Sequence, residues 1–479
     1  MFRNQFLLAK NTGSIFDWHK VQISDYNLFI HPELDFTSYV ANKKEIYLLG
    51  NLYDWKNTNY SNQKICEILA KENDNIDDLI TCTNNYSGGF VIIAVFNGNI
   101  YLFHDASGQN EIYYHTDFQN LASQVKLLEK VITATNHSYL DAQEFYSSKN
   151  FLKKRIYVCN STHRSNILHL MPNHYINVHS KVVCRYFPNE MLKIKSIDQV
   201  AEQATQMIKG YLKSMAERSP IAVAVTAGYD SRILFLASLD LDCKYFIDKH
   251  ANMSNNHNDL TISSKLVSLY DKELHIIADK FEKNQKIFNE YIQSIDFPRR
   301  PKAHVINFPG HIYINGNISE IARNYYGYHK KISGEDLCYF CGYADSKYPA
   351  SLYYNWLQDN TNLFKSLGYN YLDMFYWEER MGNWASKSKT ESLAIGKKVI
   401  SPFNSRALIT LMLSVERKYR DSHYNVLYNK IIELLSENRQ QVRRLPINPC
   451  TKSSMIRIMK KMKIYNLYRQ IGLKYRFLK

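Results

Sequence analysis

The sequence predicts two closely packed domains: a β-rich domain at the N-terminus, followed by an α/β domain built on a parallel sheet. The chain has 479 residues, which is too long for one ordinary hydrophobic core. Short apolar runs with turn signals occupy residues 1–185. Beyond residue 220, strand and helix patterns alternate instead. A composition of 45% hydrophobic and 22% charged residues is typical of a globular protein.

Strand patterns dominate the N-terminal domain. Leu48–Asp54 and Gly88–His115 combine apolar runs with polar interruptions, as strands and hairpins do. The Asn-Gly pair at 97–98 is a strong signal for a tight hairpin turn. The strand pattern breaks near Lys181–Lys195, and a helix is expected over Ile197–Ala216. We therefore place the second domain at residues 195–440.

The last part of the chain, residues 441–479, is expected to be a basic amphipathic tail. Twelve Lys or Arg residues and no acids lie between Arg439 and Lys479, so the remaining chain carries only +3 of the total charge of +15. Its apolar residues recur at helical spacing, at Met455, Ile458, Met459, Met462 and Tyr465. We expect this helix to dock on the protein itself, or to contact a membrane surface, a partner protein or a polyanion.

The main functional signal lies where the second domain begins. Ile221–Val225 is apolar throughout, which is typical of a strand buried on both faces, and Ile233–Leu239 reads as a helix. Thr226–Ser231 must therefore form a strand-to-helix corner, where we expect Gly228 to supply backbone freedom and Ala227 to keep the approach narrow. At such a corner the first helical amides point outward unpaired, and they form an anion site suited to phosphate.

The corner also carries hydroxyl groups and one acid. Thr226 and Ser231 supply hydroxyl donors, and Asp230 is the single carboxylate. An acid beside a phosphate site usually indicates Mg²⁺ bridging carboxylate and phosphate oxygens. The loop lacks the Gly-Lys-Ser/Thr ending of the Walker type, and a dinucleotide fingerprint would need three glycines where only Gly228 is present.

Further strands and helices extend the pattern. Lys244–Ile247 is expected to be a strand, a helix is expected from Asp259 to Tyr270, and His275–Ala278 is expected to be the next strand. An apolar strand then leads to Gly316, and a short loop carrying Glu320 precedes another helix. This alternation predicts a doubly wound parallel sheet. Carboxylates that follow neighbouring strands of such a sheet can hold Mg²⁺ together, although each acid alone could simply cap a helix or pair on the surface.

Three segments resemble the asparagine synthetase family of N-type ATP pyrophosphatases. Residues 226–231, Thr-Ala-Gly-Tyr-Asp-Ser, resemble the Ser-Gly-Gly-x-Asp-Ser pyrophosphate loop of these enzymes. The segment His311–Gly327 resembles the second acidic motif, Gly-Glu-Gly-x-Asp-Glu, with Asn317 in place of the first glutamate and Glu320 at the metal-binding aspartate. Val399–Leu413 resembles the Arg-Val-Pro-Phe-Leu-Asp segment and the helix after it.

The resemblance implies an adenine nucleotide alpha hydrolase-like sheet that binds ATP and Mg²⁺. The metal ligands would be Asp230 and Glu320. The family places a lysine shortly before its third motif, where it neutralises departing pyrophosphate, and this role would fall to Lys389, with Lys387 as the alternative. The residues that would contact ATP are Val225, Thr226, Ala227, Gly228, Tyr229, Asp230, Ser231 and Gly316. The run Phe375–Trp384 could line an acceptor pocket through Arg380, or form a packed helix with a buried ion pair.

The N-terminal domain resembles the glutaminase domain of the same family, which implies an Ntn-hydrolase-like fold. In that family a cysteine in second position attacks glutamine, whereas this chain has Phe2, which offers no nucleophile. The asparagine that donates to the oxyanion is replaced by Leu49. We therefore expect a degenerate domain that releases no ammonia.

Together these signals predict a synthetase that adenylates a carboxylate with ATP and passes the acyl group to ammonia or an amine. The carboxylate and the amine acceptor would be small molecules, peptides or sugar acids. One alternative is an RNA-modifying pyrophosphatase that binds RNA through the basic tail. This alternative does not explain the N-terminal domain. The other alternative is a non-catalytic nucleotide-binding protein. Scattered cysteines and the lack of a signal peptide or membrane span predict a cytoplasmic protein.

Overall fold

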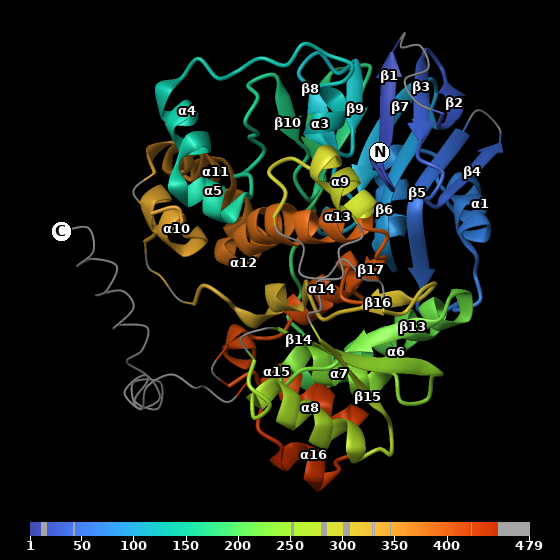
Figure 1. Ribbon diagram of the computed structural model, residues 1–479, viewed down its shortest axis with the longest axis vertical. Helices are drawn as coiled ribbons and strands as arrows, with labels where there is room; N and C mark the ends of the chain where they lie inside the picture. The colour runs from blue at the N-terminus through green and yellow to red at the C-terminus, as the bar shows by residue number, and fades with distance from the viewer. Residues whose placement is uncertain are drawn as a thin grey trace.

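The computed structural model describes residues 1–10, 17–41, 44–250, 253–278, 285–299, 307–327, 329, 331–344, 346–422 and 424–448. An N-terminal part with two antiparallel sheets is followed by an α/β part with a five-stranded parallel sheet (Figure 1). In this view the antiparallel strands lie at the upper right, and the parallel sheet lies below them. The predicted order of a β-rich part and then an α/β part is confirmed.

Each of the two N-terminal sheets has six strands, and all neighbouring strands that pair in them are antiparallel. The first sheet has the order β10-β8-β9-β1-β3-β2 and the second has the order β12-β11-β7-β6-β5-β4. The strands of the first sheet are β1 (Phe6–Lys10), β2 (His19–Ile23), β3 (Tyr26–Ile30), β8 (Tyr113–His115), β9 (Asn120–Ala122) and β10 (Ile167–His169). The strands of the second sheet are β4 (Phe36–Ala41), β5 (Lys44–Asp54), β6 (Tyr86–Phe96), β7 (Asn99–His104), β11 (His174–Asn177) and β12 (Val182–Arg185).

Apolar side chains fill the space between these two sheets. Leu8 of the first sheet and Val91 of the second belong to one buried cluster. The opposite face of the second sheet is covered by α1 (Asn62–Glu72) and α2 (Ile76–Thr83), whose apolar residues share a second cluster with it. The Asn-Gly pair at 97–98 forms the β6–β7 turn with φ of 48° and 79°, so the predicted hairpin is confirmed.

The α/β part is built on a parallel sheet with the strand order β15-β14-β13-β16-β17. Its strands are β13 (Ile221–Ala224), β14 (Cys243–Lys249), β15 (Leu274–Ala278), β16 (Ile312–Ile314) and β17 (Val399–Ile400). The first strand is central, and the chain proceeds outward from it first on one side and then on the other. The strand order therefore reverses between β13 and β16, which is where open α/β sheets bind ligands.

Helices pack on this sheet and connect it to the N-terminal part. Helices α6, α7 and α15 contact one another, and α7 also contacts β13. At the upper left of Figure 1, α10 and α11 lie beside α4 and α5. The helices are α3 (Val125–Leu128), α4 (Leu140–Ser147), α5 (Lys149–Lys154), α6 (Ile197–Arg218), α7 (Tyr229–Ala237), α8 (Asn258–Ser268), α9 (Gln285–Ser294), α10 (Gly334–Cys341), α11 (Lys347–Ser366), α12 (Tyr371–Phe375), α13 (Ser386–Ala394), α14 (Arg406–Leu413), α15 (Val426–Leu435) and α16 (Gln440–Arg444), together with the 3-10 helices η1 (Ser319–Arg323) and η3 (Arg417–Arg420) and the π-helix η2 (Tyr376–Ala385).

Buried hydrogen bonds join the two parts. Asn404, in the segment between β17 and α14, donates from Nδ2 to Oδ1 of Asp105 at 2.8 Å. Its Oδ1 accepts from the backbone N–H of Ser107 at 3.1 Å. The indole of Trp377 donates to the carbonyl of Ala106 at 2.7 Å. Because these groups are buried, separating the two parts would leave polar atoms without partners.

The basic tail falls mostly outside the described residues. Residues 441–448 are described, with Val442 fully buried, whereas the expected amphipathic helix from Met455 to Tyr465 is not among them. Within the described ranges, no helix combines the length and apolar character needed to cross a membrane.

Candidate nucleotide and metal site

The corner after β13 is held together by its own hydroxyl groups. Val225 is fully buried and its N–H donates to the Phe246 carbonyl of β14 at 2.8 Å. The hydroxyls of Thr226 and Ser231 lie 2.8 Å apart, and the N–H of Gly228 donates to the Thr226 hydroxyl at 3.2 Å. Helix α7 begins at Tyr229, four residues earlier than the apolar pattern predicts, so Asp230 lies in its first turn.

The expected reason for glycine at position 228 is wrong. Gly228 has φ −77° and ψ 164°, an extended conformation that any residue adopts, so backbone freedom is not what the corner requires. A Cβ at this position would lie 3.3 Å from the Thr226 hydroxyl oxygen. The corner therefore favours glycine at this position because a larger side chain would crowd the paired hydroxyls.

The anion-binding character of the corner is partly used by the protein itself. The N–H of Ala227 donates to Oδ1 of Asp259, which lies in the first turn of α8, at 3.0 Å. Gly228, the N-cap of α7, has no side chain with which to cap the helix, and the N–H of Asn448 donates to the Ala227 carbonyl at 3.0 Å. The ring of Tyr229 turns toward Tyr428 of α15, at 6.0 Å between centroids, rather than across the loop.

Asp230 has the properties of a metal ligand. Its side chain is 21% exposed, and Oδ1 is buried with no hydrogen-bond partner. Its Oδ2 lies 3.6 Å from the Arg323 guanidinium. A Cβ on Gly316 would lie 2.4 Å from Cβ of Asp230, so glycine at the end of β16 allows this segment to pack directly on the acid. A buried carboxylate oxygen without a donor is a position that a cation can fill.

Glu320 lies on the 3-10 helix η1 rather than in a loop, near enough for its negative charge to act on Asp230. Its Oε2 accepts a hydrogen bond from the Tyr376 hydroxyl at 2.6 Å. Burial raises the pKa of Asp230 to about 6; the positive charge of Arg323 opposes this rise, and the negative charge of Glu320 adds to it. Two neighbouring carboxylates with a free buried oxygen fit Mg²⁺, which takes oxygen ligands.

This pKa leads to a prediction for metal affinity. Below a pH of about 6, protons compete with the metal for Asp230, whereas above it the carboxylate is ionised and available. We expect Mg²⁺ affinity to fall about tenfold per pH unit below 6 and to level off above 7. Titration calorimetry of Mg²⁺ with a nonhydrolysable ATP analogue between pH 5 and 8 measures this. A profile with the same pH dependence in the wild type and in Asp230→Asn would contradict it, because the variant retains only the titration of the nucleotide phosphates.

Lys389 lies on the wall of a cavity of about 190 Å³ at the interface between the two parts. The cavity is also lined by Ala224 at the end of β13 and by Asn317. The Lys389 ammonium donates to Oδ1 of Asn110 at 2.7 Å, and burial lowers its pKa to about 8, so it remains mostly charged at pH 7. Among the described residues, no hydrogen bond or ion pair joins Lys389 to Asp230 or Glu320.

The competing lysine has a different environment. Lys387 is buried and donates to the backbone carbonyl of Asp296 at 2.6 Å. It is not among the residues that line the cavity. Of the two candidates, Lys389 is therefore the one placed to meet a ligand there.

The run Phe375–Trp384 forms the end of α12 and most of η2, and it contains a buried ion pair. Glu378 is 1% exposed and pairs with Arg185. Arg380 instead stacks on Trp384, with its guanidinium 4.3 Å from the ring centroid. The packed-helix interpretation is thus the one that the contacts support.

Three residues around the site were not singled out from the sequence for this role: Asp259, Arg323 and Tyr376. They contact Ala227, Asp230 and Glu320 respectively, and in each case other strands or helices lie between the two residues along the chain. One feature of the sequence could have placed two of them near the site. Asp259 follows β14 and Arg323 follows β16, and both strands run parallel to β13, so their carboxyl ends lie at the same edge of the sheet as the corner.

Buried apolar side chains lie where the resemblance of the N-terminal part places glutaminase chemistry. Phe2 is fully buried in the hydrophobic core, and Leu49 is fully buried as well. A cavity lined by Asn4, Leu49 and Asn110 measures about 20 Å³. This is about the space of one water molecule.

Comparison with known proteins assigns no family: no family model matches the chain, and no curated protein matches it. The resemblance to asparagine synthetases therefore rests on the motifs alone, and the activity that it implies is a proposal.

Proposed function

We propose that the chain is an ATP-dependent synthetase that adenylates a carboxylate, releases pyrophosphate and transfers the acyl group to an amine or ammonia. The observation that carries this proposal is the pair Asp230 and Glu320. They follow β13 and β16, on the two sides of the point where the strand order reverses, and Asp230 has a buried oxygen without a partner. This is the position at which an open α/β sheet binds ligands.

The roles of the residues follow from their charges. Asp230 and Glu320 would hold Mg²⁺, which neutralises phosphate oxygens and makes pyrophosphate a better leaving group. The first turn of α7 would bind phosphate oxygens through its amides. Lys389 would offer its ammonium to the departing pyrophosphate from the cavity wall. Binding both substrates in one site would supply much of the acceleration, because reacting atoms are then held in place.

The nitrogen source in this proposal is not glutamine. Phe2 carries no nucleophile and the nearby cavity measures only about 20 Å³, so the N-terminal part would act as a scaffold. The acyl acceptor would be free ammonia, an amine on a second substrate or an amine within the same molecule.

An adenylation assay tests the proposal directly. Purified full-length protein is incubated with ATP, Mg²⁺ and a panel of carboxylates that includes aspartate and sugar acids, and AMP and pyrophosphate are measured together. We expect at least one carboxylate to give both products in equal amounts. If nucleotide binds but every member of a broad panel leaves ATP intact, the synthetase proposal fails.

A non-catalytic nucleotide-binding function is the second candidate. It is favoured by the two charged groups that already occupy the site: Asp259 accepts from the Ala227 N–H, and Arg323 lies beside Asp230. The Asp259 carboxylate thus takes a position that a phosphate would use, and the Arg323 guanidinium takes one that a metal ion would use. ATP titrations with and without Mg²⁺, run beside the adenylation assay, separate the candidates: a protein that binds ATP but releases no AMP with any carboxylate fits this second candidate, whereas a protein that binds no nucleotide fits neither.

Gly89 allows a test of Lys389 that spares the fold. A Cβ on Gly89 would lie 1.5 Å from Nζ of Lys389 and 2.9 Å from its Cε. Because these atoms are the flexible end of the side chain, Gly89→Ala should push the ammonium away with little loss of stability. We expect pyrophosphate release to slow about 10- to 100-fold and the melting temperature to change by less than about 2 °C.

The matched control is Lys398→Met, which removes a half-exposed lysine paired with Asp35. We expect this control to keep the wild-type rate. A Gly89→Ala variant with an unchanged rate would show that Lys389 has no part in the reaction.

A further inference from the structure

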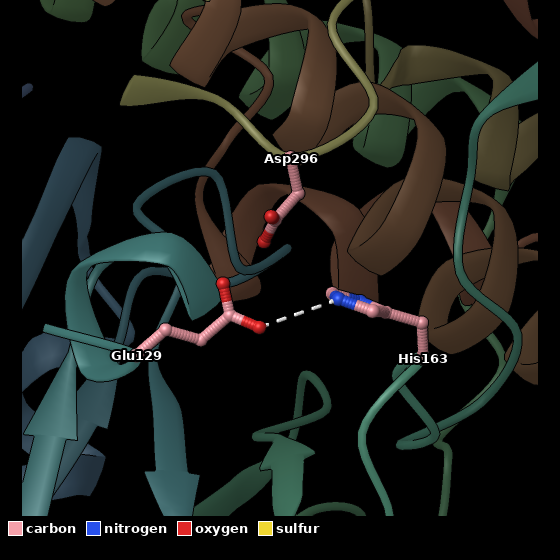
Figure 2. A group of neighbouring side chains, drawn as sticks. All are labelled: Glu129, His163 and Asp296. Carbon is pink, nitrogen blue, oxygen red and sulfur yellow. Dashed lines mark ion pairs between the residues drawn. The ribbon is translucent and has the colours of Figure 1, made fainter. Parts of the chain in front are cut away.

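Three side chains far from the nucleotide loop in sequence meet between the two parts of the chain. Glu129 follows α3, His163 lies in the loop before β10, and Asp296 lies just after α9. Figure 2 shows the two carboxylates and the imidazole directed toward one another. Each offers one ligand atom, and these atoms all lie within 4.8 Å of one another.

Asp296 indicates that this cluster is built to hold a ligand. Its side chain is 4% exposed, and Oδ2 has no hydrogen-bond partner. Its carboxylate points toward Glu129 and His163 (Figure 2). An ionised carboxylate buried without a partner is costly. A bound cation would both supply the missing partner and stabilise the charge.

The other two groups are held in orientations that suit a metal. Nε2 of His163 lies 3.5 Å from Oε1 of Glu129, and its Nδ1 lies 2.7 Å from the Tyr157 hydroxyl oxygen. When Nδ1–H donates to that oxygen, the Nε2 lone pair is free to bind a metal. The Nε of Arg164 lies 2.6 Å from Oε1 of Glu129, and this cation favours the ionised carboxylate.

We propose that Glu129, His163 and Asp296 bind one divalent transition-metal ion, for which Zn²⁺ is the best match. One imidazole nitrogen and two carboxylate oxygens suit Zn²⁺, whereas Mg²⁺ takes oxygen ligands and keeps several waters. Zinc bonds of about 2.0–2.2 Å place tetrahedral ligand atoms roughly 3.3–3.6 Å apart. Small side-chain rotations would close the cluster to that size, with water as the fourth ligand.

The position of the site suggests a structural role. The backbone carbonyl of Asp296 accepts from Lys387 of α13, and Arg299 forms an ion pair with Glu391 of the same helix at 2.6 Å. The segment that carries Asp296 is therefore attached to α13, which also carries Lys389. A metal bound to Glu129 and His163 as well would tie this helix to the N-terminal sheets.

Zinc binding to the full-length protein tests this inference without nucleotide. Protein stripped with chelator is titrated with Zn²⁺ by calorimetry, metal content is measured after dialysis, and melting is followed with and without Zn²⁺. We expect one equivalent to bind and to raise the melting temperature. In Asp296→Asn and His163→Gln, affinity should fall at least about 100-fold and the zinc-dependent shift should disappear.

The matched control is Asp117→Asn, which alters a second His–Asp pair, with His115 at 2.7 Å, that has no third ligand in the part of the chain that the structure describes. This control should bind Zn²⁺ as the wild type does. Asp296→Asn keeps the shape of the side chain and removes an unpartnered charge, so its melting without metal should match the wild type and show that it folds. Absence of zinc binding in the wild type, or equal binding in all variants, would overturn the proposal.

Discussion

Asp230→Asn is expected to lower the rate of pyrophosphate release by more than about 100-fold. The substitution removes the negative charge from the buried carboxylate that would hold Mg²⁺ beside Glu320, while the shape of the side chain is retained. Oδ1 has no hydrogen-bond partner to lose, and the contact that the substitution weakens is the ion pair of Oδ2 with Arg323 at 3.6 Å, so stability is measured together with the rate. The rate of pyrophosphate release in the presence of ATP, Mg²⁺ and an active carboxylate is the measurement.

Asp240→Asn is the matched control for this variant. Asp240 is 82% exposed and pairs with Lys209 at 3.4 Å, so we expect its loss to leave the rate unchanged. Melting curves of both variants separate an effect on chemistry from unfolding. A wild-type rate in Asp230→Asn would remove the metal role of this acid and with it the main support for the proposed function.

The largest effect on stability is expected from Arg232→Met. Arg232 lies in α7, is fully buried, and donates to the carbonyls of Val442, Leu445 and Pro446 at 3.3, 3.1 and 2.8 Å. Methionine fills similar space but leaves these three carbonyls without their donor. We expect a loss of about 3–5 kcal/mol in the free energy of unfolding. This corresponds to a fall of roughly 3–5 °C in the melting temperature of a chain of 479 residues, measured by calorimetry or circular dichroism.

Arg443→Met provides the comparison from the same segment of chain. Arg443 is 53% exposed and pairs with Glu433 at 2.8 Å, so its removal should cost less than about 1 kcal/mol. Equal shifts in the two variants would mean that the buried guanidinium does not anchor residues 442–446 to α7.

The sequence alone predicts much of the α/β part because its signals are local. An unbroken apolar run marks β13, and neighbouring residues mark the corner that follows it. Regular alternation then predicts further strands, and the structure shows β14, β15 and β16 where they are expected, with bounds shifted by one or two residues. The start of α7 was less predictable, because its first turn carries polar residues that do not follow the apolar pattern.

Other features follow only from contacts between distant residues. The sequence predicts that Asp230 and Glu320 meet, but not that Arg323 and Tyr376 lie beside them. It also gives no sign that Asp259 reaches the Ala227 amide. Contacts between segments that are far apart in the chain depend on how the elements pack, and a local pattern carries no record of this.

The sequence by itself determined the order of a β-rich part and an α/β part, the strand-to-helix corner and the types of residue that the corner carries. Periodicity and turn chemistry act over a few residues, so they can be recognised along the chain. Only the tertiary structure decided which strand is central, which lysine faces the cavity and which buried carboxylates lack partners. These properties depend on burial and on neighbours from other segments, which exist only once the chain has folded.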